Sequence, residues 1–238
     1  DSRNTLYQHF LRVVELINPK VVLIENVKEI VGYRLPDGTK IIEDILEFFD
    51  EHNYVYDYKI LNCRNYGIPQ DRKRFFFLAF RQDLGIKHIN LEDLMSQFIR
   101  PEITFNEAVS DLPYVRAREF AEGTVLKYTT APKNVYQKHL RGDCTELCNH
   151  IPMQHTDKTV QKFEFILAQN DMPLPDDLKP RVRSHTDQIS TATYGQNHRV
   201  IDVNKVSPTI TASFYSSFIH PSQPRNLTVR EAARIQTF

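Results

Sequence analysis

The sequence predicts an α/β fold, in which part of an open, doubly wound sheet is joined to a smaller, loop-rich domain. Near the N-terminus an amphipathic helix pattern leads directly into a short apolar run, the order of elements in doubly wound sheets. A second helix pattern and two strand-like segments follow, and the periodicity weakens from about residue 110. We therefore expect a partial α/β domain over residues 1–110, a loop-rich domain over residues 111–205, and a segment over residues 206–238 that returns to the first domain.

The first elements are a predicted helix over about residues 4–18 and a predicted strand over Val21–Ile24. Asn18-Pro19 ends the helix. The run Val21–Ile24 is too short for a helix, so it predicts a strand that is buried on both faces, as in a parallel sheet. The helix is recognised by apolar residues at helical spacing, namely Leu6, Phe10, Val13, Val14 and Ile17.

A turn at Pro36-Asp37-Gly38 precedes a second amphipathic helix. Two strands, Tyr54–Leu61 and Arg74–Phe80, are joined by the turn Asn65–Pro69, so we expect them to pair near the edge of the same sheet. The second helix is indicated by Ile41, Ile42, Ile45, Leu46 and Phe49.

A third helix is predicted over Leu227–Phe238. Thr228 is placed as its N-cap and Glu231 follows three residues later, which is the spacing of a capping box.

Composition indicates a globular protein with 41% hydrophobic and 25% charged residues. The net charge of zero does not favour a nucleic-acid binder, although a balanced total can contain a local basic face. No apolar run reaches the roughly 18 residues of a membrane span. Three cysteines are too few for a disulfide framework and indicate a reducing cytoplasm. The seven glycines form no glycine-rich phosphate or dinucleotide loop.

Two short segments in the first domain contain candidate functional residues. Glu25 and Asn26 follow the first strand, and ligands of open α/β sheets bind at the carboxyl ends of the strands. Partial desolvation there would raise the pKa of the Glu25 carboxyl and suit it to share a proton, although an ordinary polar strand end is the alternative. In the second segment, Arg72 and Arg74 would lie on one face of an extended chain and clamp a phosphate or a base edge, with Lys73 opposite. The alternative there is a solvated, basic start of a strand.

Near the C-terminus, Arg230 and Arg234 are one helical turn apart, and Glu231 could pair locally. The alternative is an ordinary charged helix surface. Upstream, Ser207–Thr211 presents hydroxyl groups on an extended stretch, a pattern suited to contact with phosphate.

In their order and spacing, these segments resemble the DNA (cytosine-5) methyltransferase family. Asp1–Leu6, Pro19-Lys20 and Glu25-Asn26-Val27 look like the stretch after that family's Pro-Cys motif. Tyr66–Arg74 is similar to its Gln-x-Arg-x-Arg motif. Ser207–Thr211 and Arg225–Gln236 look like the stretch that closes its target-recognition region.

The resemblance implies a Rossmann-like methyltransferase sheet with a target-recognition domain over residues 111–205. It also implies S-adenosylmethionine as cofactor and double-stranded DNA as partner, with recognition of a specific sequence. In this family a cysteine attacks C6 of a flipped-out cytosine and C5 receives the methyl group. Glu25 matches the residue that shares a proton at N3, Arg74 the arginine at O2, and Arg72 its partner on the adjacent backbone. The other substrate-binding residues it implies are Asn26, Gln70, Thr209, Thr211, Arg225 and Arg230.

The resemblance also predicts that two family features precede Asp1: the glycine-rich cofactor loop and the Pro-Cys motif. The closing motif normally continues past Phe238, so we expect a truncated sequence that does not methylate DNA alone. A second polypeptide could supply the missing features, and the residues that contact the cofactor stay unassigned. Two alternatives remain open: a catalytically inactive DNA-binding or regulatory relative, and an RNA cytosine methyltransferase. A cytoplasmic protein is expected, associated with the nucleoid if bacterial.

The cysteines indicate neither a replacement nucleophile nor a metal site. Cys63 lies where the family tends to have a small buried residue, so we expect a structural role. Cys144, Cys148, His150 and His155 have a spacing that fits no common zinc finger, so no metal is expected.

Overall fold

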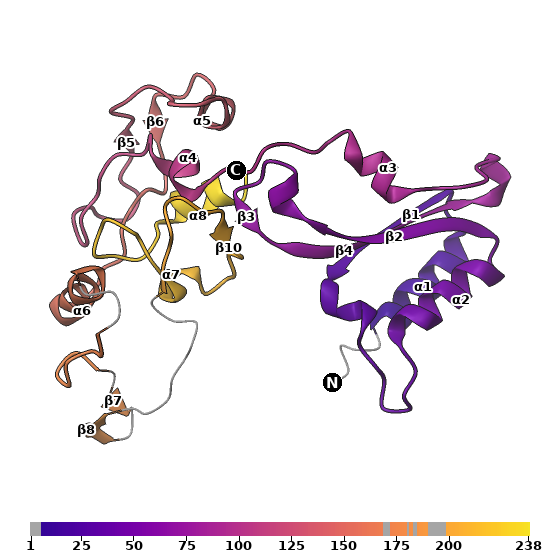
Figure 1. Ribbon diagram of the computed structural model, residues 1–238, viewed down its shortest axis with the longest axis horizontal. Coiled ribbons are helices and arrows are strands. Elements are labelled where there is room, and N and C mark those ends of the chain that lie inside the picture. The colour runs from indigo at the N-terminus through magenta and orange to yellow at the C-terminus, as the bar shows by residue number, and fades with distance from the viewer. Residues whose placement is uncertain (1–5, 169–171, 180, 183–184, 190–198) are drawn as a thin grey trace. The chain divides into compact units, whose positions relative to one another are not determined.

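The computed structural model describes residues 6–168, 172–179, 181–182, 185–189 and 199–238 (Figure 1). The chain forms two compact units. The first comprises Asp1–Gly67 and Arg72–Pro101, and the second comprises Ile68–Asp71 and Glu102–Phe238. The predicted α/β fold class is confirmed, whereas the division at residues 110 and 205 remains a prediction.

The first unit is a three-stranded sheet with helices. The predicted first and second helices are confirmed as α1 and α2. Its elements in chain order are α1 (Leu6–Ile17), β1 (Val21–Val27), the 3-10 turn η2 (Lys28–Val31), α2 (Ile41–Glu51), β2 (Tyr54–Asn62), the turn η3 (Cys63–Asn65), β4 (Lys73–Arg81), the turn η4 (Gln82–Leu84) and α3 (Leu91–Ser96).

The strand order β1-β4-β2 corrects one sequence-based expectation. Strand β4 runs antiparallel to both neighbours, so the predicted pairing of β2 with β4 is confirmed, but β1 does not lie in a parallel pair. The reason is that the chain turns back after β2 and inserts β4 between β2 and β1. Strand β1 is also not buried on both faces: Val22 is buried, whereas Val21 and Leu23 are 47% and 62% exposed.

Helices α1 and α2 lie on one face of this sheet (Figure 1). Their apolar faces pack against alternate residues of the strands, with Phe49 of α2 and Phe75 and Phe77 of β4 at 0% exposure. No helix covers the other face of β1 within the part of the chain that the structure describes. Because side chains alternate along a strand, Glu25 lies on this open face and Asn26 lies on the helix face.

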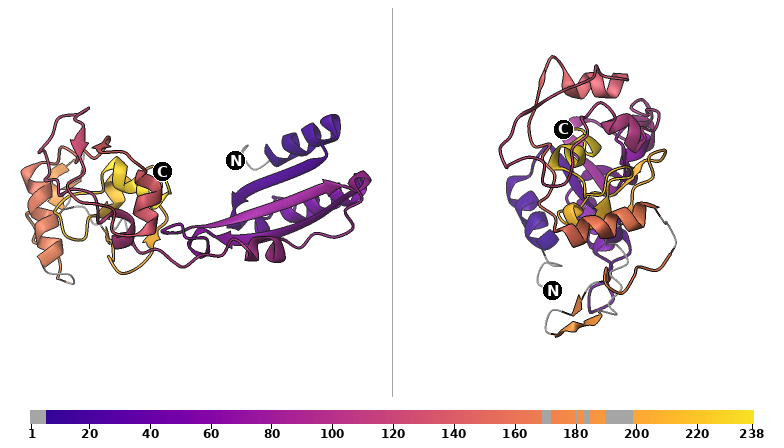
Figure 2. Two further views of the ribbon diagram at one scale, coloured as in Figure 1. Left: turned by 90° about the horizontal axis from the view of Figure 1, so that it is seen from above. Right: turned by 90° about the vertical axis from the view of Figure 1, so that its left-hand side faces the viewer.

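The second unit is loop-rich, and most of its strands have two residues. Its elements are β3 (Gln70–Asp71), α4 (Phe105–Val109), β5 (Leu126–Lys127), α5 (Val135–Arg141), β6 (Glu146–Leu147), α6 (Asp157–Ala168), β7 (Arg181–Val182), β8 (His185–Ile189), β9 (Arg199–Val200), β10 (Ser207–Pro208), α7 (Phe214–Ser217), β11 (Phe218–Ile219) and α8 (Val229–Ile235). Figure 2 shows these elements from two further sides.

Two parallel strand pairs connect distant parts of this unit: β10 pairs with β3, and β11 pairs with β9. The main core lies where α4 and α8 meet, with Phe105, Leu227 and Ile235 almost fully buried. The predicted capping box is confirmed, since the Thr228 hydroxyl accepts from the Glu231 backbone N–H and the Glu231 carboxylate accepts from the Thr228 backbone N–H.

None of the helices that the structure describes is long and apolar enough to cross a membrane.

Candidate functional site

Glu25 and Arg74 form an ion pair on the open face of the sheet in the first unit. The distance from Arg74 Nε to Glu25 Oε1 is 3.0 Å. In the β1–β4 register Glu25 is opposite Phe76 and Val27 is opposite Arg74, so the two side chains are diagonal neighbours on one face. Arg74 also donates from Nη1 to its neighbouring Lys73 carbonyl, at 2.9 Å. A carboxylate and a guanidinium are thus fixed side by side.

The position of Glu25 differs from the sequence-based expectation. Strand β1 continues to Val27, so Glu25 lies inside the strand and not after it. Its side chain is 51% exposed, because nothing that the structure describes covers this part of the open face. The expected desolvation of Glu25 is therefore not found, and its orientation depends on Arg74.

Arg72 lies at the same end of the sheet. Its backbone carbonyl accepts a hydrogen bond from Cys63 N, at 2.9 Å. Asn62 is opposite Lys73 in the β2–β4 register, so the turn that begins at Cys63 lies beside the start of β4. The Arg72 guanidinium has no hydrogen-bond partner within the part of the chain that the structure describes, and it is therefore available to an anionic ligand.

Cys63 is half-buried, and burial raises the pKa of its thiol although Arg72 and Arg74 oppose the shift. A nucleophilic cysteine needs the thiolate form. The structural role predicted for Cys63 therefore agrees with its environment. Turn η3, which begins at Cys63, is capped by the side chain of Asn62.

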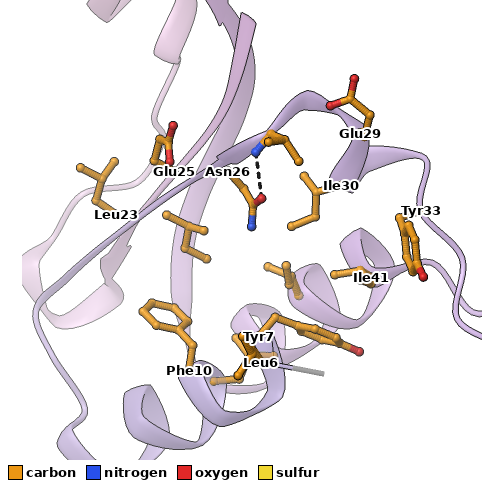
Figure 3. A pocket seen from close by; sticks show the side chains of 14 residues that line it. Leu6, Tyr7, Phe10, Leu23, Glu25, Asn26, Glu29, Ile30, Tyr33 and Ile41 are labelled. Atoms are coloured by element: carbon orange, nitrogen blue, oxygen red, sulfur yellow. Dashed lines mark hydrogen bonds between the residues drawn. The ribbon is translucent and has the colours of Figure 1, made fainter. Parts of the chain in front are cut away.

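Asn26 lines a pocket of about 490 Å³ between β1, α1 and α2 (Figure 3). Its Oδ1 accepts a hydrogen bond from Val27 N, at 2.8 Å, and Figure 3 shows that Glu25 and Asn26 point to opposite sides of β1. The remaining lining is mainly apolar, with Leu6, Phe10 and Ile30 among its residues. The Asn26 side chain thus bonds to the backbone of the residue that follows it, and its predicted contact with substrate remains a prediction.

Gln70 and Thr209 hold two chain segments of the second unit together. Gln70 is 1% exposed, and its Oε1 accepts from Ile210 N, at 3.2 Å. Thr209 donates from its hydroxyl to the Asp71 carbonyl, at 2.7 Å. Both residues therefore have structural partners, whereas Thr211 is exposed, and among the described residues its hydroxyl bonds to the nearby Ser213 hydroxyl alone, at 3.1 Å.

Arg225 is fully buried and makes a bidentate ion pair with Glu231, at 2.7 and 2.8 Å. Its remaining donors bond to Val115 O, Gln223 Oε1 and Asn226 O. Burial opposes ionisation of Glu231, but the Arg225 guanidinium outweighs it and holds the pKa of Glu231 well below its usual value. Because Arg225 is fully buried and each of its three guanidinium nitrogens is hydrogen-bonded within the protein, its geometry indicates a structural role.

Arg230 and Arg234 do not form one charged surface. Arg230 donates from Nε to Cys148 O, at 3.0 Å. Arg234 is 1% exposed and donates to Tyr128 Oη, at 2.9 Å, and to Asp111 Oδ2, at 3.3 Å. The sequence did not predict the buried ion pair of Arg225 with Glu231, because these residues are six positions apart. It did not predict the buried pair of Arg234 with Asp111 either, because Asp111 is distant in sequence.

Two buried histidines near Glu231 were also not predicted. His220 Nε2 lies 3.6 Å from Glu231 Oε1, and burial lowers the pKa of His220 to about 4. His150 bonds through Nδ1 to the Thr228 hydroxyl and through Nε2 to the Pro113 carbonyl, both at 2.9 Å. Because both ring nitrogens of His150 are occupied, this residue is not available to a metal. Among the described residues there is no group of three or more His, Cys, Asp or Glu side chains that could hold a metal ion.

The whole chain matches one protein-family model, described as C-5 cytosine-specific DNA methylase, over residues 1–238. The type II methyltransferase M.DdeI of Desulfomicrobium norvegicum is 37% identical over 242 residues, which cover all of this chain and 57% of that protein. M.XorII of Xanthomonas oryzae pv. oryzae is 29% identical over 265 residues, which cover all of this chain and 55% of that protein. The chain spans about half the length of the curated relatives it matches.

Among solved structures, a putative DNA modification methyltransferase encoded within an E. coli prophage superposes with a TM-score of 0.68. The superposition covers 99% of this chain and 64% of that chain, with 23% sequence identity. This similarity supports the fold.

Proposed function

Since the chain belongs to the C-5 cytosine-specific DNA methylase family, we propose that it is part of an enzyme that methylates C5 of cytosine in double-stranded DNA. S-adenosylmethionine would supply the methyl group. The type II methyltransferases among the relatives support recognition of a specific sequence within a restriction–modification system. The observation on which the proposal depends is the Glu25–Arg74 pair on the open face of the sheet, formed by two residues that match the family's motifs.

Glu25 is proposed as the group that shares a proton with N3 of the flipped-out cytosine. Nucleophilic attack at C6 pushes electron density into the ring, and a proton at N3 stabilises that density. The half-exposed carboxylate is open to a base from the side of the sheet that the helices leave free. Arg74 holds this carboxylate in one orientation and is proposed to donate to O2 of the same base.

Arg72 is proposed to bind the DNA backbone next to the target base. Its guanidinium has no partner among the described residues, and arginine forms strong, forked hydrogen bonds with phosphate. Flipping a cytosine out of the duplex costs a few kcal/mol of free energy. Several hydrogen bonds of this kind would offset roughly that cost.

The pocket beside Asn26 does not by itself fit the cofactor. Its lining is mainly apolar, and the 238 residues contain no glycine-rich loop to bind an adenosyl group. No cofactor contact is therefore assigned to it. Gln70, Thr209, Arg225 and Arg230 are proposed to position the second unit's segments, with Thr211 as a direct substrate contact.

The test is transfer of labelled methyl groups from S-adenosylmethionine to unmethylated double-stranded DNA by protein from the complete reading frame. We expect label in 5-methylcytosine. Glu25→Gln removes the acidic proton but keeps the shape, so it should lower kcat at least about 100-fold while DNA binding persists. Glu15→Gln, a 61%-exposed glutamate of α1, is the matched control and should retain full activity.

The outcomes separate the candidate functions. Unchanged turnover of Glu25→Gln would remove Glu25 from the mechanism. Folded protein that binds S-adenosylmethionine but labels no DNA would refute the proposed function. Label in RNA would then support the RNA methyltransferase, and DNA binding without any label would support the inactive relative.

A further inference from the structure

A short turn, residues 63–67, connects strand β2 to the segment that contains Arg72. We call it the motif turn. Its first residue is bonded to that segment, since Cys63 N donates to the Arg72 carbonyl, at 2.9 Å. Tyr66 N donates to the Cys63 carbonyl, at 3.0 Å, and closes the turn. A displacement of the motif turn would therefore also displace the backbone of Arg72.

The motif turn is also bonded to Arg100, later in the chain. The Arg100 backbone N–H donates to the Asn65 carbonyl, at 2.9 Å, and Tyr66 forms an isolated parallel β-bridge with Arg100. The motif turn, Arg72 and Arg100 all belong to the first unit. Backbone bonds to both arginines thus fix the position of the turn.

Gly67, the last residue of the motif turn, has no room for a side chain. Its φ of +72° lies in the left-handed region, which glycine adopts without steric cost. A Cβ atom at this position would lie 3.1 Å from the Arg100 Cβ and 3.8 Å from the Pro101 carbonyl oxygen. Carbon atoms in favourable contact are about 3.5–4.0 Å apart. Any side chain at residue 67 would therefore push the turn and Arg100 apart.

Gly85 has nearly the same backbone conformation without this contact. Its φ is +73°, and a Cβ atom there would meet nothing within 4 Å. A substitution at Gly85 therefore introduces backbone strain alone, whereas the same substitution at Gly67 introduces strain together with a collision. The two glycines allow the effect of the collision to be measured separately.

We propose that Gly67 is a positioning residue for DNA binding. By leaving room for Arg100 it holds the motif turn in place, and through the Cys63–Arg72 bond it places the Arg72 guanidinium for a DNA phosphate. Gly67 acts through Arg72 and does not itself contact DNA. This inference rests on the proposed function, because it requires the proposed contact of Arg72 with the DNA backbone.

The experiment measures the Kd of the complete protein for fragments of unmethylated genomic DNA at several salt concentrations. Arg72→Gln should weaken binding and reduce the slope of log Kd against log salt by about one, because one phosphate contact is lost. Gly67→Ala should weaken binding about threefold to tenfold and lower the slope in the same direction, since a misplaced guanidinium makes a poorer hydrogen bond to phosphate. Gly67→Ala combined with Arg72→Gln should bind no more weakly than Arg72→Gln alone, because both changes remove the same contact.

Two further variants separate positioning from general strain. Gly85→Ala is the matched control: it should lower the unfolding temperature by about a few degrees and leave the Kd and the salt slope unchanged. Arg100→Gly removes the Cβ atom that a side chain at residue 67 would meet. Gly67→Ala with Arg100→Gly should therefore bind DNA as Arg100→Gly alone does.

The outcomes distinguish the two proposals. Equal losses of affinity in Gly67→Ala and Gly85→Ala, no recovery with Arg100→Gly, or additive effects of Gly67→Ala and Arg72→Gln would each overturn this inference. Normal methylation by the wild type together with unchanged binding by Arg72→Gln would overturn it too, while methyl transfer to DNA would stand. A wild type that neither binds nor methylates DNA would overturn both proposals.

A folding defect in Gly67→Ala does not prevent the test. In that case the double variant with Arg100→Gly is compared with Arg100→Gly alone. A double variant that folds and binds DNA equally well supports the inference. One that also fails to fold overturns it, because space beside Arg100 would then not be what residue 67 requires.

Discussion

Replacing Glu231 with alanine should destabilise the second unit far more than the loss of a helix cap alone. Glu231 is 2% exposed and satisfies both the fully buried Arg225 guanidinium and the Thr228 backbone N–H. Removing one partner of a buried ion pair costs about 3–5 kcal/mol, because the other charge stays buried without compensation. The lost cap adds about 1 kcal/mol.

The chain provides a matched control in its second capping box. Thr104 and Glu107 make the same reciprocal bonds at the start of α4, but Glu107 is exposed and has no buried arginine to neutralise. Glu107→Ala should therefore cost only about 1 kcal/mol. The difference between the two variants isolates the ion pair.

Thermal unfolding of the complete protein, followed by circular dichroism, measures this difference. Each kcal/mol corresponds to about 2–4 °C for a domain of this size. Glu231→Ala should lower the unfolding temperature by about 8–24 °C and Glu107→Ala by about 2–4 °C. Equal shifts for the two variants would refute the reasoning. A further check is Arg225→Met combined with Glu231→Leu, which should recover much of the lost stability because apolar pairs often replace buried ion pairs without cost.

Two further predictions concern acid stability and Cys63. Burial lowers the pKa of His220 to about 4, so the unfolded chain binds this proton more readily than the folded chain. The contribution of His220 to the free energy of unfolding is therefore fully present above about pH 6.5. It decreases by about 3 kcal/mol as the pH falls toward 4. Unfolding temperatures measured from pH 8 to pH 5 check this, and a flat profile would contradict it. Cys63→Ala should keep methyl transfer within a few-fold of wild type, since burial raises the pKa of this thiol; a loss as large as that of Glu25→Gln would argue for a chemical role.

Local signals in the sequence were enough to predict three of the helices that the structure describes, but not α3 to α7. Apolar spacing identified α1 and α2, and the pair Thr228 and Glu231 identified the start of α8. These elements depend on residues within one or two turns of each other. Short-range periodicity therefore determines them.

The sheet could not be predicted in the same way. Val21 and Leu23 are apolar but exposed, so β1 has the residue pattern of a strand buried on both faces while one of its faces is open. The direction of its partner depends on β4, about fifty residues later in the chain. Nothing near β1 in the sequence contains that information.

The candidate site shows the same limit. Motif order identified Glu25 and Arg74, but their ion pair depends on the β1–β4 register. Arg225 belongs to a charged segment that suggested a surface, yet the fold buries it against Glu231. Whether a charged residue is exposed or buried depends on the partner that the fold provides.

The path of the chain between the two units limits how this protein can be recombined with its relatives. Residues 68–71 belong to the second unit, although their flanking residues on both sides belong to the first. A chimera that exchanges only residues 102–238 would therefore combine β10 of the relative with Gln70 and Asp71 of this protein. The bonds that Gln70 and Asp71 make to residues 207–210 would then have to form with a different sequence. An exchange of sequence specificity should accordingly transplant two segments, the tetrapeptide at residues 68–71 together with the larger C-terminal piece.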